Sequence, residues 1–274
     1  MTRLCNTVYQ KISHRTGDPA KIRKLFFIIT YFIFLIFPRN FAKKYYTVAK
    51  EKLRKFAELS TFPNVFQNFT WPEVNLQNHK GETLDMKGKW RSEYFKNDQP
   101  LIVELACGRG DYTLNMAKIY PNHNFIGVDI KGNRIWSGAK QAIEEKLNNV
   151  AFIRTRIEIL DHYFEPNEIS EIWITFPDPF PTTRRRRNRL TYTRFLELYR
   201  SLLVNDGVVH LKTDSVLLYE YTLEMLKKNN CTTLIDIFDI YKNGYDEPLL
   251  DIKTKYEKMH IADGRTIQYL KFRL

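Results

Sequence analysis

The sequence has few of the residues that build cross-linked or metal-stabilised proteins. Its three cysteines, Cys5, Cys107 and Cys231, are far apart and show neither C-x-x-C nor Cys/His spacing. This pattern indicates no disulfide framework and no metal site. The simplest location for such a chain is a reducing one, the cytoplasm.

A hydrophobic run long enough to cross a bilayer is also missing. The longest, Leu25 to Phe37, has 13 residues, whereas a transmembrane helix needs about 20. No small-residue cleavage site follows it, as a secretory signal peptide would require. We interpret residues 1–47 as an extension whose residue types resemble translated A/T-rich upstream DNA, with the native start near Val48. A membrane anchor is the alternative.

Acidic residues are scarce at the start of the chain. Residues 1–55 contain 13 of the 43 lysines and arginines but 2 of the 31 acidic residues. The net charge of +12 therefore resides almost entirely there, and the rest of the chain is nearly neutral. Its largest basic concentration is the arginine run, residues 184–189 (RRRRNR). A focused basic rim beside a site fits this distribution better than a general polyanion-binding surface.

Residues 171–190 read EIWITFPDPFPTTRRRRNRL. The apolar, β-branched beginning predicts a buried strand. Three prolines at alternate positions then exclude a helix or a sheet ladder and define the proline loop, residues 177–182. This loop offers a carboxylate, Asp178, and a ring, Phe180, to a nucleic-acid base, while the arginine run can bind phosphates. A solvated surface loop is the alternative.

A second motif begins at residue 101. Residues 101–106 (LIVELA) predict a strand buried on both faces, followed by the glycine turn, residues 107–111 (CGRGD), and a helix that ends before Pro121. A second strand covers residues 125–130 and carries Asp129 near its end. Together these elements form the nucleotide-binding βαβ unit. Glu104 adds a carboxylate inside the first strand, which is costly unless it serves a partner.

The glycine turn contains Gly108 and Gly110, and no third glycine follows on the helix. A dinucleotide site requires a three-glycine fingerprint, and Glu104 would repel a phosphate. Glycines let the backbone approach a ligand, and Asp129 can accept hydrogen bonds from ribose hydroxyls. The residues therefore favour an adenosine ligand without phosphates and with a positive amine, S-adenosylmethionine.

Strands and helices alternate to the C-terminus, which predicts an α/β fold with a doubly wound, mostly parallel sheet and helices on both faces. We place this Rossmann-like domain at residues 100–274. The preceding region, residues 48–99, is expected to hold a short helix at 49–59 and an irregular wrapping segment at 60–90. The later elements are expected as helices at 134–147, 192–203 and 216–228 and strands at 150–155, 171–176, 208–213, 233–240 and 266–272.

Ligands of such sheets bind at the carboxyl ends of the strands. Five polar residues are predicted at strand ends: Glu104, Asp129, Thr155, Asp178 and Asp214.

Five segments occur in one order: LIVELACGRGDY, FIGVDIKGNRI, FPDPFP with the arginine run and NRLT, DGVVHLKTDS, and TKYE ahead of GRTIQYL. In this combination residues 49–274 resemble the tRNA (guanine-N7)-methyltransferases. The resemblance implies a class I S-adenosylmethionine-dependent enzyme that forms 7-methylguanosine at position 46, in the variable loop of tRNA.

The resemblance also implies site residues. Asp178 is expected to be the catalytic residue, at the meeting point of cofactor and guanine. The implied cofactor-binding residues are Glu104, Gly108, Gly110, Asp129, Thr155, Arg156 and Asp178. The implied substrate-binding residues are Phe180, Thr182, Arg184, Arg185, Arg186, Arg187, Asp214, Thr254, Lys255, Tyr256 and Glu257.

The sequence departs from the family pattern at four positions. Ala106 stands where the family usually has glycine, and Thr155 stands near a usual acid or amide. Phe180 replaces a tryptophan and Thr182 a lysine. We expect Arg184 to replace the charge that is missing at Thr182.

Several alternatives stay open at this point. The chain could be a methyltransferase of the same fold with a non-RNA substrate, or a tRNA-binding homologue that has lost catalysis. Asp214 and Thr254 could be helix caps, and Glu257 a solvated helix residue. Cys107, His162 and His210 are expected to be structural, since they lack partner patterns.

Overall fold

The structure is a computed structural model, and it describes residues 50–69, 72–245 and 247–274. The predicted extension at residues 1–47 lies outside these residues. The first described element is helical over residues 50–59, as the apolar spacing predicts, and it ends at the fully buried Leu59. No helix within the described ranges is long and apolar enough to cross a membrane.

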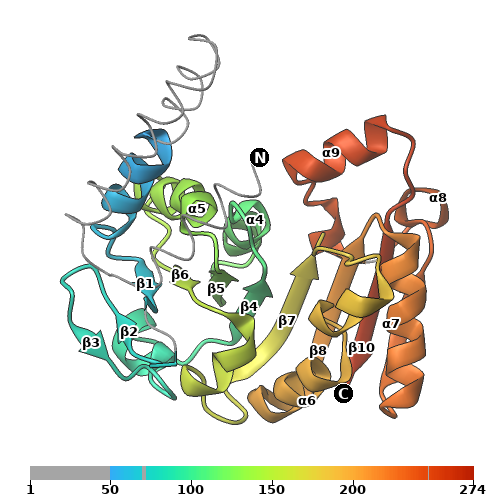
Figure 1. The fold of residues 1–274 in the computed structure, drawn as a ribbon, viewed down its shortest axis with the longest axis horizontal. Helices are drawn as coiled ribbons and strands as arrows, with labels where there is room; N and C mark the ends of the chain where they lie inside the picture. Colours follow the sequence, from blue (N-terminus) through green and yellow to red (C-terminus); the bar gives the residue numbers. More distant parts are fainter. Residues whose placement is uncertain (1–49, 70–71, 246) are drawn as a thin grey trace.

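One ten-stranded sheet organises the fold, in the order β3-β2-β1-β6-β5-β4-β7-β8-β10-β9 (Figure 1). The strands are β1 (Val65–Gln67), β2 (Leu76–Gln77), β3 (Thr83–Leu84), β4 (Leu101–Leu105), β5 (Asn124–Asp129), β6 (Val150–Arg154), β7 (Ile169–Thr175), β8 (Leu203–Thr213), β9 (Thr232–Ile237) and β10 (Gln268–Arg273). The helices are α4 (Asp111–Ile119), α5 (Gly132–Glu144), α6 (Thr193–Leu202), α7 (Val216–Lys228), α8 (Ile240–Asn243) and α9 (Lys255–Ala262).

The centre of the sheet is parallel. β4 pairs with β5 on one side and with β7 on the other, so that Leu105 lies opposite Val128 and Ile174. β8 continues beyond β7 in parallel, whereas β10 inserts antiparallel between β8 and β9. The chain order reverses between β4 and β7, and such a switch point opens a crevice at the carboxyl ends of the two strands. The glycine turn follows β4 and the proline loop follows β7.

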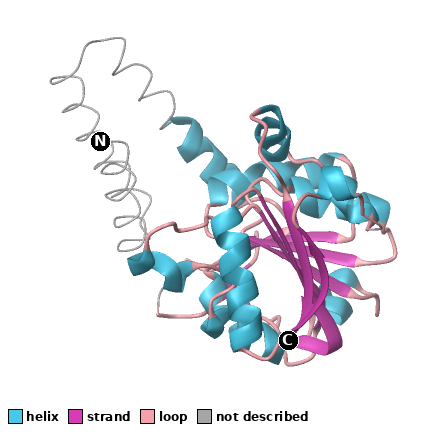
Figure 2. Cartoon of the chain, turned by 90° about the vertical axis from the view of Figure 1, so that its right-hand side faces the viewer, coloured by secondary structure: helices cyan, strands magenta, loops and turns pink. Residues whose placement is uncertain are grey.

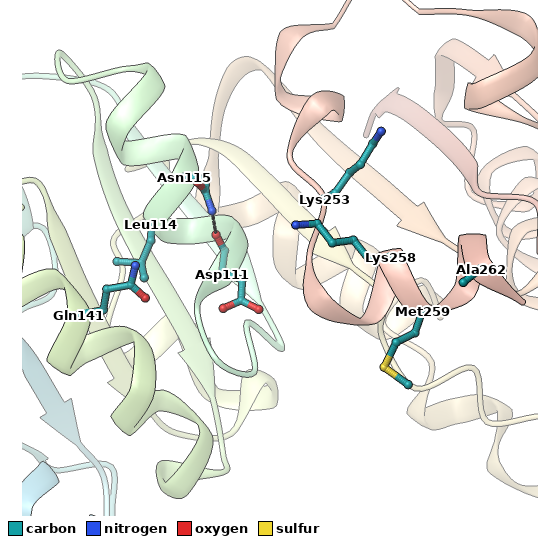
Figure 3. A pocket seen from close by; sticks show the side chains of 8 residues that line it. All are labelled: Asp111, Leu114, Asn115, Gln141, Lys253, Lys258, Met259 and Ala262. Atoms are coloured by element: carbon teal, nitrogen blue, oxygen red, sulfur yellow. Dashed lines mark hydrogen bonds between the residues drawn. The ribbon is translucent and has the colours of Figure 1, made fainter.

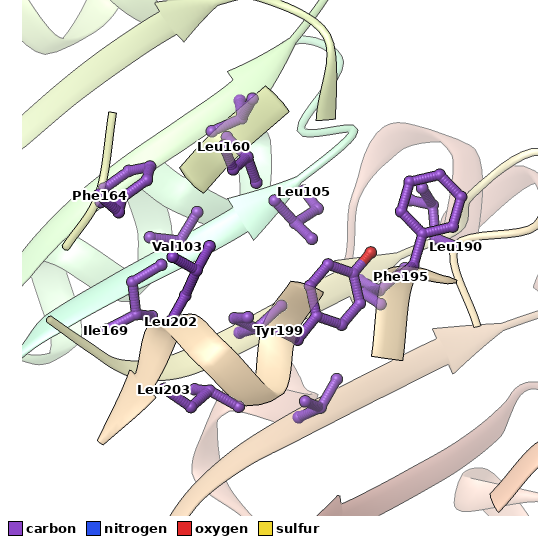
Figure 4. Packing of buried hydrophobic residues seen from close by; sticks show 14 of the residues in the cluster. Val103, Leu105, Leu160, Phe164, Ile169, Leu190, Phe195, Tyr199, Leu202 and Leu203 are labelled. Atoms are coloured by element: carbon purple, nitrogen blue, oxygen red, sulfur yellow. The ribbon is translucent and has the colours of Figure 1, made fainter. Parts of the chain in front are cut away.

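Helices cover both faces of the twisted sheet (Figure 2). On one face, α6 and α7 pack on apolar side chains of the central strands (Figure 4). The cluster includes Val103 and Leu105 of β4 and Tyr199 of α6. The other face is covered by α4 and α5. Because successive side chains of a strand point to opposite faces, Glu104 faces α4, away from the larger apolar cluster.

The predicted fold class is confirmed, and most expected elements lie within a few residues of their predicted positions. The interpretation of residues 60–90 as irregular is wrong. β1, β2 and β3 extend the sheet there, with β1 parallel to β6. Strands of two or three residues are too short to show an alternating pattern in the sequence.

Candidate active site

The glycine turn follows β4 in a left-handed conformation that side chains disfavour. Gly108 and Gly110 have φ values of 57° and 74°, and Ala106 has a φ of 56°. A Cβ on Gly110 would lie 2.6 Å from the Phe152 ring, so this glycine is needed for space as well as for its dihedral angle. A Cβ on Gly108 would meet nothing closer than 3.9 Å, which leaves that side of the turn open to a ligand.

Glu104 is 2% exposed, and other residues of the chain hydrogen-bond both its oxygens. Its Oε2 accepts hydrogen bonds from the backbone N–H of Thr113, at 2.8 Å, and from the hydroxyl of the same residue. Its Oε1 accepts from the Thr175 hydroxyl at 2.6 Å. Burial raises the pKa of Glu104 to about 7, against the opposing effect of these donors. Thr113 and Thr175 carry no sequence signal that would have marked them as its partners.

Asp129 at the end of β5 holds the glycine turn in place. Its Oδ2 accepts a hydrogen bond of 3.0 Å from the N–H of Gly108, and its Oδ1 accepts one of 2.7 Å from the N–H of Lys131. The glycine turn and this strand-end acid are therefore in direct contact, whereas the predicted contact of Asp129 with a ribose stays a prediction. Asp129 is 6% exposed and lies beside the open side of Gly108.

Thr155 and Arg156 follow the neighbouring strand, β6. The N–H of Thr155 donates to the carbonyl of Asp129 at 3.2 Å, which places Thr155 at the same edge of the sheet. Its hydroxyl is buried, 3.5 Å from that of Tyr163. Arg156 is exposed and lies 3.7 Å from the Glu158 carboxylate. Their predicted contact with adenine stays a prediction.

The proline loop carries Asp178 at the surface. The side chain is exposed, and no other described residue forms a hydrogen bond or ion pair with it. Phe180 adopts a φ of 41°, which is unusual for an aromatic residue, and the guanidinium of Arg185 lies 4.6 Å from its ring centroid. Thr182 is exposed.

The arginine run divides into two parts. Arg184, Arg185, Arg186 and Arg187 are exposed on a short helical turn, Thr183–Asn188. Arg189 is instead buried and donates hydrogen bonds to carbonyls of the proline loop. The sequence predicts one phosphate-binding rim for the whole run and does not predict this division. The buried Leu190 that follows marks the end of the exposed surface.

Asp214 follows β8 and contacts the side chains of Arg265 and His260. Its Oδ2 lies 2.7 Å from Nη1 of Arg265 and 3.1 Å from Nδ1 of His260 on α9. The alternative that Asp214 caps the next helix is wrong, because Ser215 caps α7 by accepting from the N–H of Leu218. The predicted substrate contact of Asp214 stays untested.

The TKYE segment begins α9 (Lys255–Ala262), which is drawn at the top of Figure 1. Thr254 is its N-cap and accepts a hydrogen bond of 3.1 Å from the N–H of Glu257, so the cap alternative is confirmed. The solvated-residue alternative for Glu257 is wrong, because its side chain is fully buried. The side chains of Lys255 and Tyr256 lie outside what the structure describes.

Glu257 forms a buried ion pair with Lys212 of β8. Their side chains are both 0% exposed and lie 2.8 Å apart. Lys212 also donates to the carbonyls of Leu250 and Ile252, and Tyr241 donates to Glu257. This network fixes α9 against the sheet. Lys212 is not among the predicted site residues, although a lysine in an otherwise apolar strand is the same kind of signal as Glu104.

A groove of about 520 Å³ lies between α4 and α9 (Figure 3). Asp111 and Asn115 line one wall, and Lys258 and Met259 line the other. None of the predicted site residues lines this groove. It opens beside the glycine turn, since Asp111 directly follows Gly110.

The remaining candidates are structural. Cys107 is buried, and burial raises the pKa of its thiol well above the usual value, as expected of a packing residue. His210 is buried, stacks on Trp173 at 3.8 Å and lies 2.8 Å from the Tyr269 hydroxyl. The described part of the chain holds no group of three or more His, Cys, Asp and Glu side chains suited to a metal ion.

Solved structures of low sequence identity share this fold. The structure of an antibiotic-related methyltransferase is similar with a TM-score of 0.53 and 16% identity, over 70% of this chain and 97% of that one. The 16S rRNA methyltransferase KamB is similar with a TM-score of 0.53 and 10% identity, over 70% of this chain and 96% of that one. Together with the strand order, these similarities establish the Rossmann-like methyltransferase fold.

Sequence comparisons are more specific. The family described as putative methyltransferase matches residues 98–270. The tRNA (guanine-N(7)-)-methyltransferase of Christiangramia forsetii is 45% identical over 82% of this chain and 99% of the relative. The protein of the same name from Bacteroides fragilis is 44% identical over 83% of this chain and 87% of the relative. The chain therefore belongs to the tRNA (guanine-N7)-methyltransferase family, the enzymes that depend on S-adenosylmethionine.

Proposed function

We propose that this enzyme methylates N7 of a guanine in the variable loop of tRNA, at position 46, in the cytoplasm. One observation carries the proposal: the glycine turn and the proline loop follow adjacent parallel strands, β4 and β7, at the switch point of the sheet. A methyl donor bound at the glycine turn and a base bound at the proline loop would share one crevice. The names of the relatives support the tRNA substrate.

The residues around the glycine turn fit S-adenosylmethionine. The open side of Gly108 admits a ligand to the backbone, and the two nearby carboxylates, Glu104 and Asp129, disfavour a phosphate. We assign Asp129 to the ribose hydroxyls, because a carboxylate at the second strand end is the usual acceptor for them. Glu104 holds the start of α4 through Thr113, and its negative charge favours the cofactor's ammonium end. Thr155 and Arg156 are assigned to the adenine side.

The chemistry asks little acid–base work of the protein. Bound S-adenosylmethionine supplies the sulfonium methyl group and leaves as S-adenosylhomocysteine. Guanine N7 attacks with an in-plane lone pair and carries no proton, so the chain needs no general base. The contribution of the chain is alignment of an in-line transfer, which is worth about 7–11 kcal/mol in the best intramolecular cases.

Asp178 is the residue suited to select guanine. Its exposed carboxylate is free to accept hydrogen bonds from the N1–H and N2–H groups of a guanine. Adenine offers no such pair of donors on that edge, so the contact discriminates between the purines. Asp214 and Glu257 need rearrangement before they can assist, because cations already engage both carboxylates.

The exposed arginines are suited to anchor the tRNA. Arg184, Arg185, Arg186 and Arg187 can neutralise backbone phosphates around the proline loop, and Arg184 can supply the charge that Thr182 lacks. A base that leaves its stack requires an aromatic partner, and Phe180 is the ring on this loop. Arg185 lies over one face of that ring, so a base would stack on the opposite face or displace the guanidinium.

A methyl-transfer assay tests the proposal. The purified protein, radiolabelled S-adenosylmethionine and bulk tRNA should yield labelled 7-methylguanosine, which nucleoside digestion and chromatography identify. Replacement of the variable-loop guanine in a transcript should abolish the product. Binding of tRNA without cofactor binding or methyl transfer would instead support the homologue that has lost catalysis.

A further inference from the structure

Arg189 differs from the other arginines of the run. Four neighbours in the sequence are exposed, whereas Arg189 is 6% exposed. A guanidinium cannot be deprotonated in a protein, so its burial is favourable only with well-placed partners. The Arg189 guanidinium is therefore held by the proline loop and α7, and it does not belong to the exposed basic surface of the run.

The partners of Arg189 lie in the proline loop and on α7. Its Nε donates to the carbonyl of Pro179 at 3.0 Å, and its Nη2 donates to the carbonyl of Phe180, also at 3.0 Å. The flat face of the guanidinium lies over the Tyr221 ring, 4.2 Å from the centroid. One planar group thus connects two successive carbonyls of the loop to a helix of the scaffold.

The loop needs such an external support because of its sequence. Pro177, Pro179 and Pro181 have no N–H group, so the segment cannot brace itself with its own backbone donors. Phe180 is also held at a φ of 41°, which costs about 1–3 kcal/mol for a residue with a side chain. The two hydrogen bonds from Arg189 are accepted by the carbonyls of Pro179 and Phe180, which flank the strained Phe180 backbone on both sides.

We propose that Arg189 is a positioning residue for methyl transfer: it fixes the segment Asp178–Phe180 in the orientation that presents the guanine, and it does not bind phosphate. The inference rests on the proposed function. It divides the arginine run into an exposed part that binds RNA and one buried member that orients the loop.

Steady-state kinetics of Arg189→Lys and Arg187→Ala on tRNA separate these two roles. Lysine keeps the charge but cannot bridge two carbonyls with a planar fork. Arg189→Lys should lower kcat by about 10- to 100-fold, as expected for a misplaced reacting group, with KM for tRNA within about twofold. Arg187→Ala should raise KM, and the slope of log(kcat/KM) against log salt should become shallower by about one.

Two further variants test the same arrangement where Arg189→Lys is unstable. Tyr221→Leu removes the ring below the guanidinium and should lower kcat about tenfold. Tyr221→Phe is its matched control, since it keeps the ring and the Tyr221 hydroxyl has no hydrogen-bond partner among the described residues. Thermal melting and S-adenosylmethionine affinity, measured on each variant, report folding and the cofactor site separately.

An activity-independent readout distinguishes failure of this inference from failure of the proposed function. Loosening of the proline loop should speed tryptic cleavage at the exposed arginines by about fivefold or more in Arg189→Lys, whether or not tRNA is methylated. A shallower salt slope with unchanged kcat and unchanged cleavage would show that Arg189 is a phosphate contact and overturn the inference. Absence of methyl transfer by the unmodified enzyme would overturn the proposed function alone.

Discussion

The hydroxyl of Thr175 donates a hydrogen bond of 2.6 Å to the buried carboxylate of Glu104. Thr175 ends β7 and precedes the proline loop, whereas Glu104 lies in β4 ahead of the glycine turn. One buried contact therefore joins the strand that precedes the proline loop to the strand that precedes the glycine turn. In the proposed reaction, these adjacent strands would align the guanine with the methyl donor.

Thr175→Val should weaken this link. The substitution keeps the shape but removes the donor, and a hydrogen bond to a charged group contributes about 1.5–3 kcal/mol. We expect a loss of that size in the free energy of unfolding at pH 8, measured with urea. Thr175→Ser retains the hydroxyl and is the control. If Thr175→Val is as stable as the unmodified protein, the hydrogen bond to Glu104 does not contribute to stability.

The stability of the protein should depend on the ionisation of Glu104. Burial raises its folded pKa from 4.5 to about 7, so the folded state binds one more proton than the unfolded state between these values. Stability from this group is therefore complete below pH 4.5 and is lost as the pH rises through 7, by on the order of 3 kcal/mol.

Urea unfolding of the unmodified protein and Glu104→Gln at pH 5 and pH 8 measures this effect. The other titrating groups are shared, so the difference between the two proteins isolates Glu104. The stability of the variant relative to the unmodified protein should increase from pH 5 to pH 8. A constant difference would show that the pKa of Glu104 is not raised.

The two glycines of the glycine turn should respond differently to alanine. Gly110→Ala brings a Cβ to 2.6 Å from the Phe152 ring at a φ of 74°, so we expect a loss of about 2–4 kcal/mol in stability. Gly108→Ala meets no atom within 3.9 Å, so its cost should be about 1 kcal/mol.

Among folded molecules, Gly108→Ala should reduce the affinity for S-adenosylmethionine more than Gly110→Ala does. In Gly108→Ala the new methyl group projects into the space assigned to S-adenosylmethionine, and calorimetry should show affinity reduced tenfold or more. An unchanged affinity would place the ligand elsewhere.

The buried pair of Lys212 and Glu257 gives a fourth prediction. Lys212→Met leaves an uncompensated buried carboxylate, which should cost about 3–5 kcal/mol in chemical denaturation. The double variant Lys212→Met with Glu257→Gln removes both charges and should recover most of that loss. If the double variant is as unstable as the single one, the hydrogen bonds from Lys212 to Leu250 and Ile252 are the dominant contribution.

The sequence predicts best those features whose residues lie close together along the chain. Central parallel strands are buried on both faces, so they read as apolar runs, and a carboxylate such as Glu104 is conspicuous inside one. The glycine turn with Asp129 is recognisable because its parts have fixed spacing. These features were sufficient for the fold class, the strand ends and the family.

Contacts between distant segments were not predictable in the same way. Thr175 and Glu104 are 71 residues apart, and a threonine fits any strand end whether or not it holds an acid. Arg189 has the same identity as its exposed neighbours, so burial alone distinguishes it. Glu257 resembled a solvated helix residue because its partner, Lys212, lies far away in the sequence, on strand β8.

Asp178, the exposed carboxylate of the proline loop, is the residue on which the proposed guanine site depends most. Single-turnover methyl transfer to tRNA by Asp178→Asn, at saturating S-adenosylmethionine, tests it directly. We expect the rate to fall by about tenfold or more, because an amide cannot accept both guanine N–H groups, while the protein remains folded and binds the cofactor. A single-turnover rate equal to that of the unmodified enzyme would contradict the placement of the guanine beside Asp178.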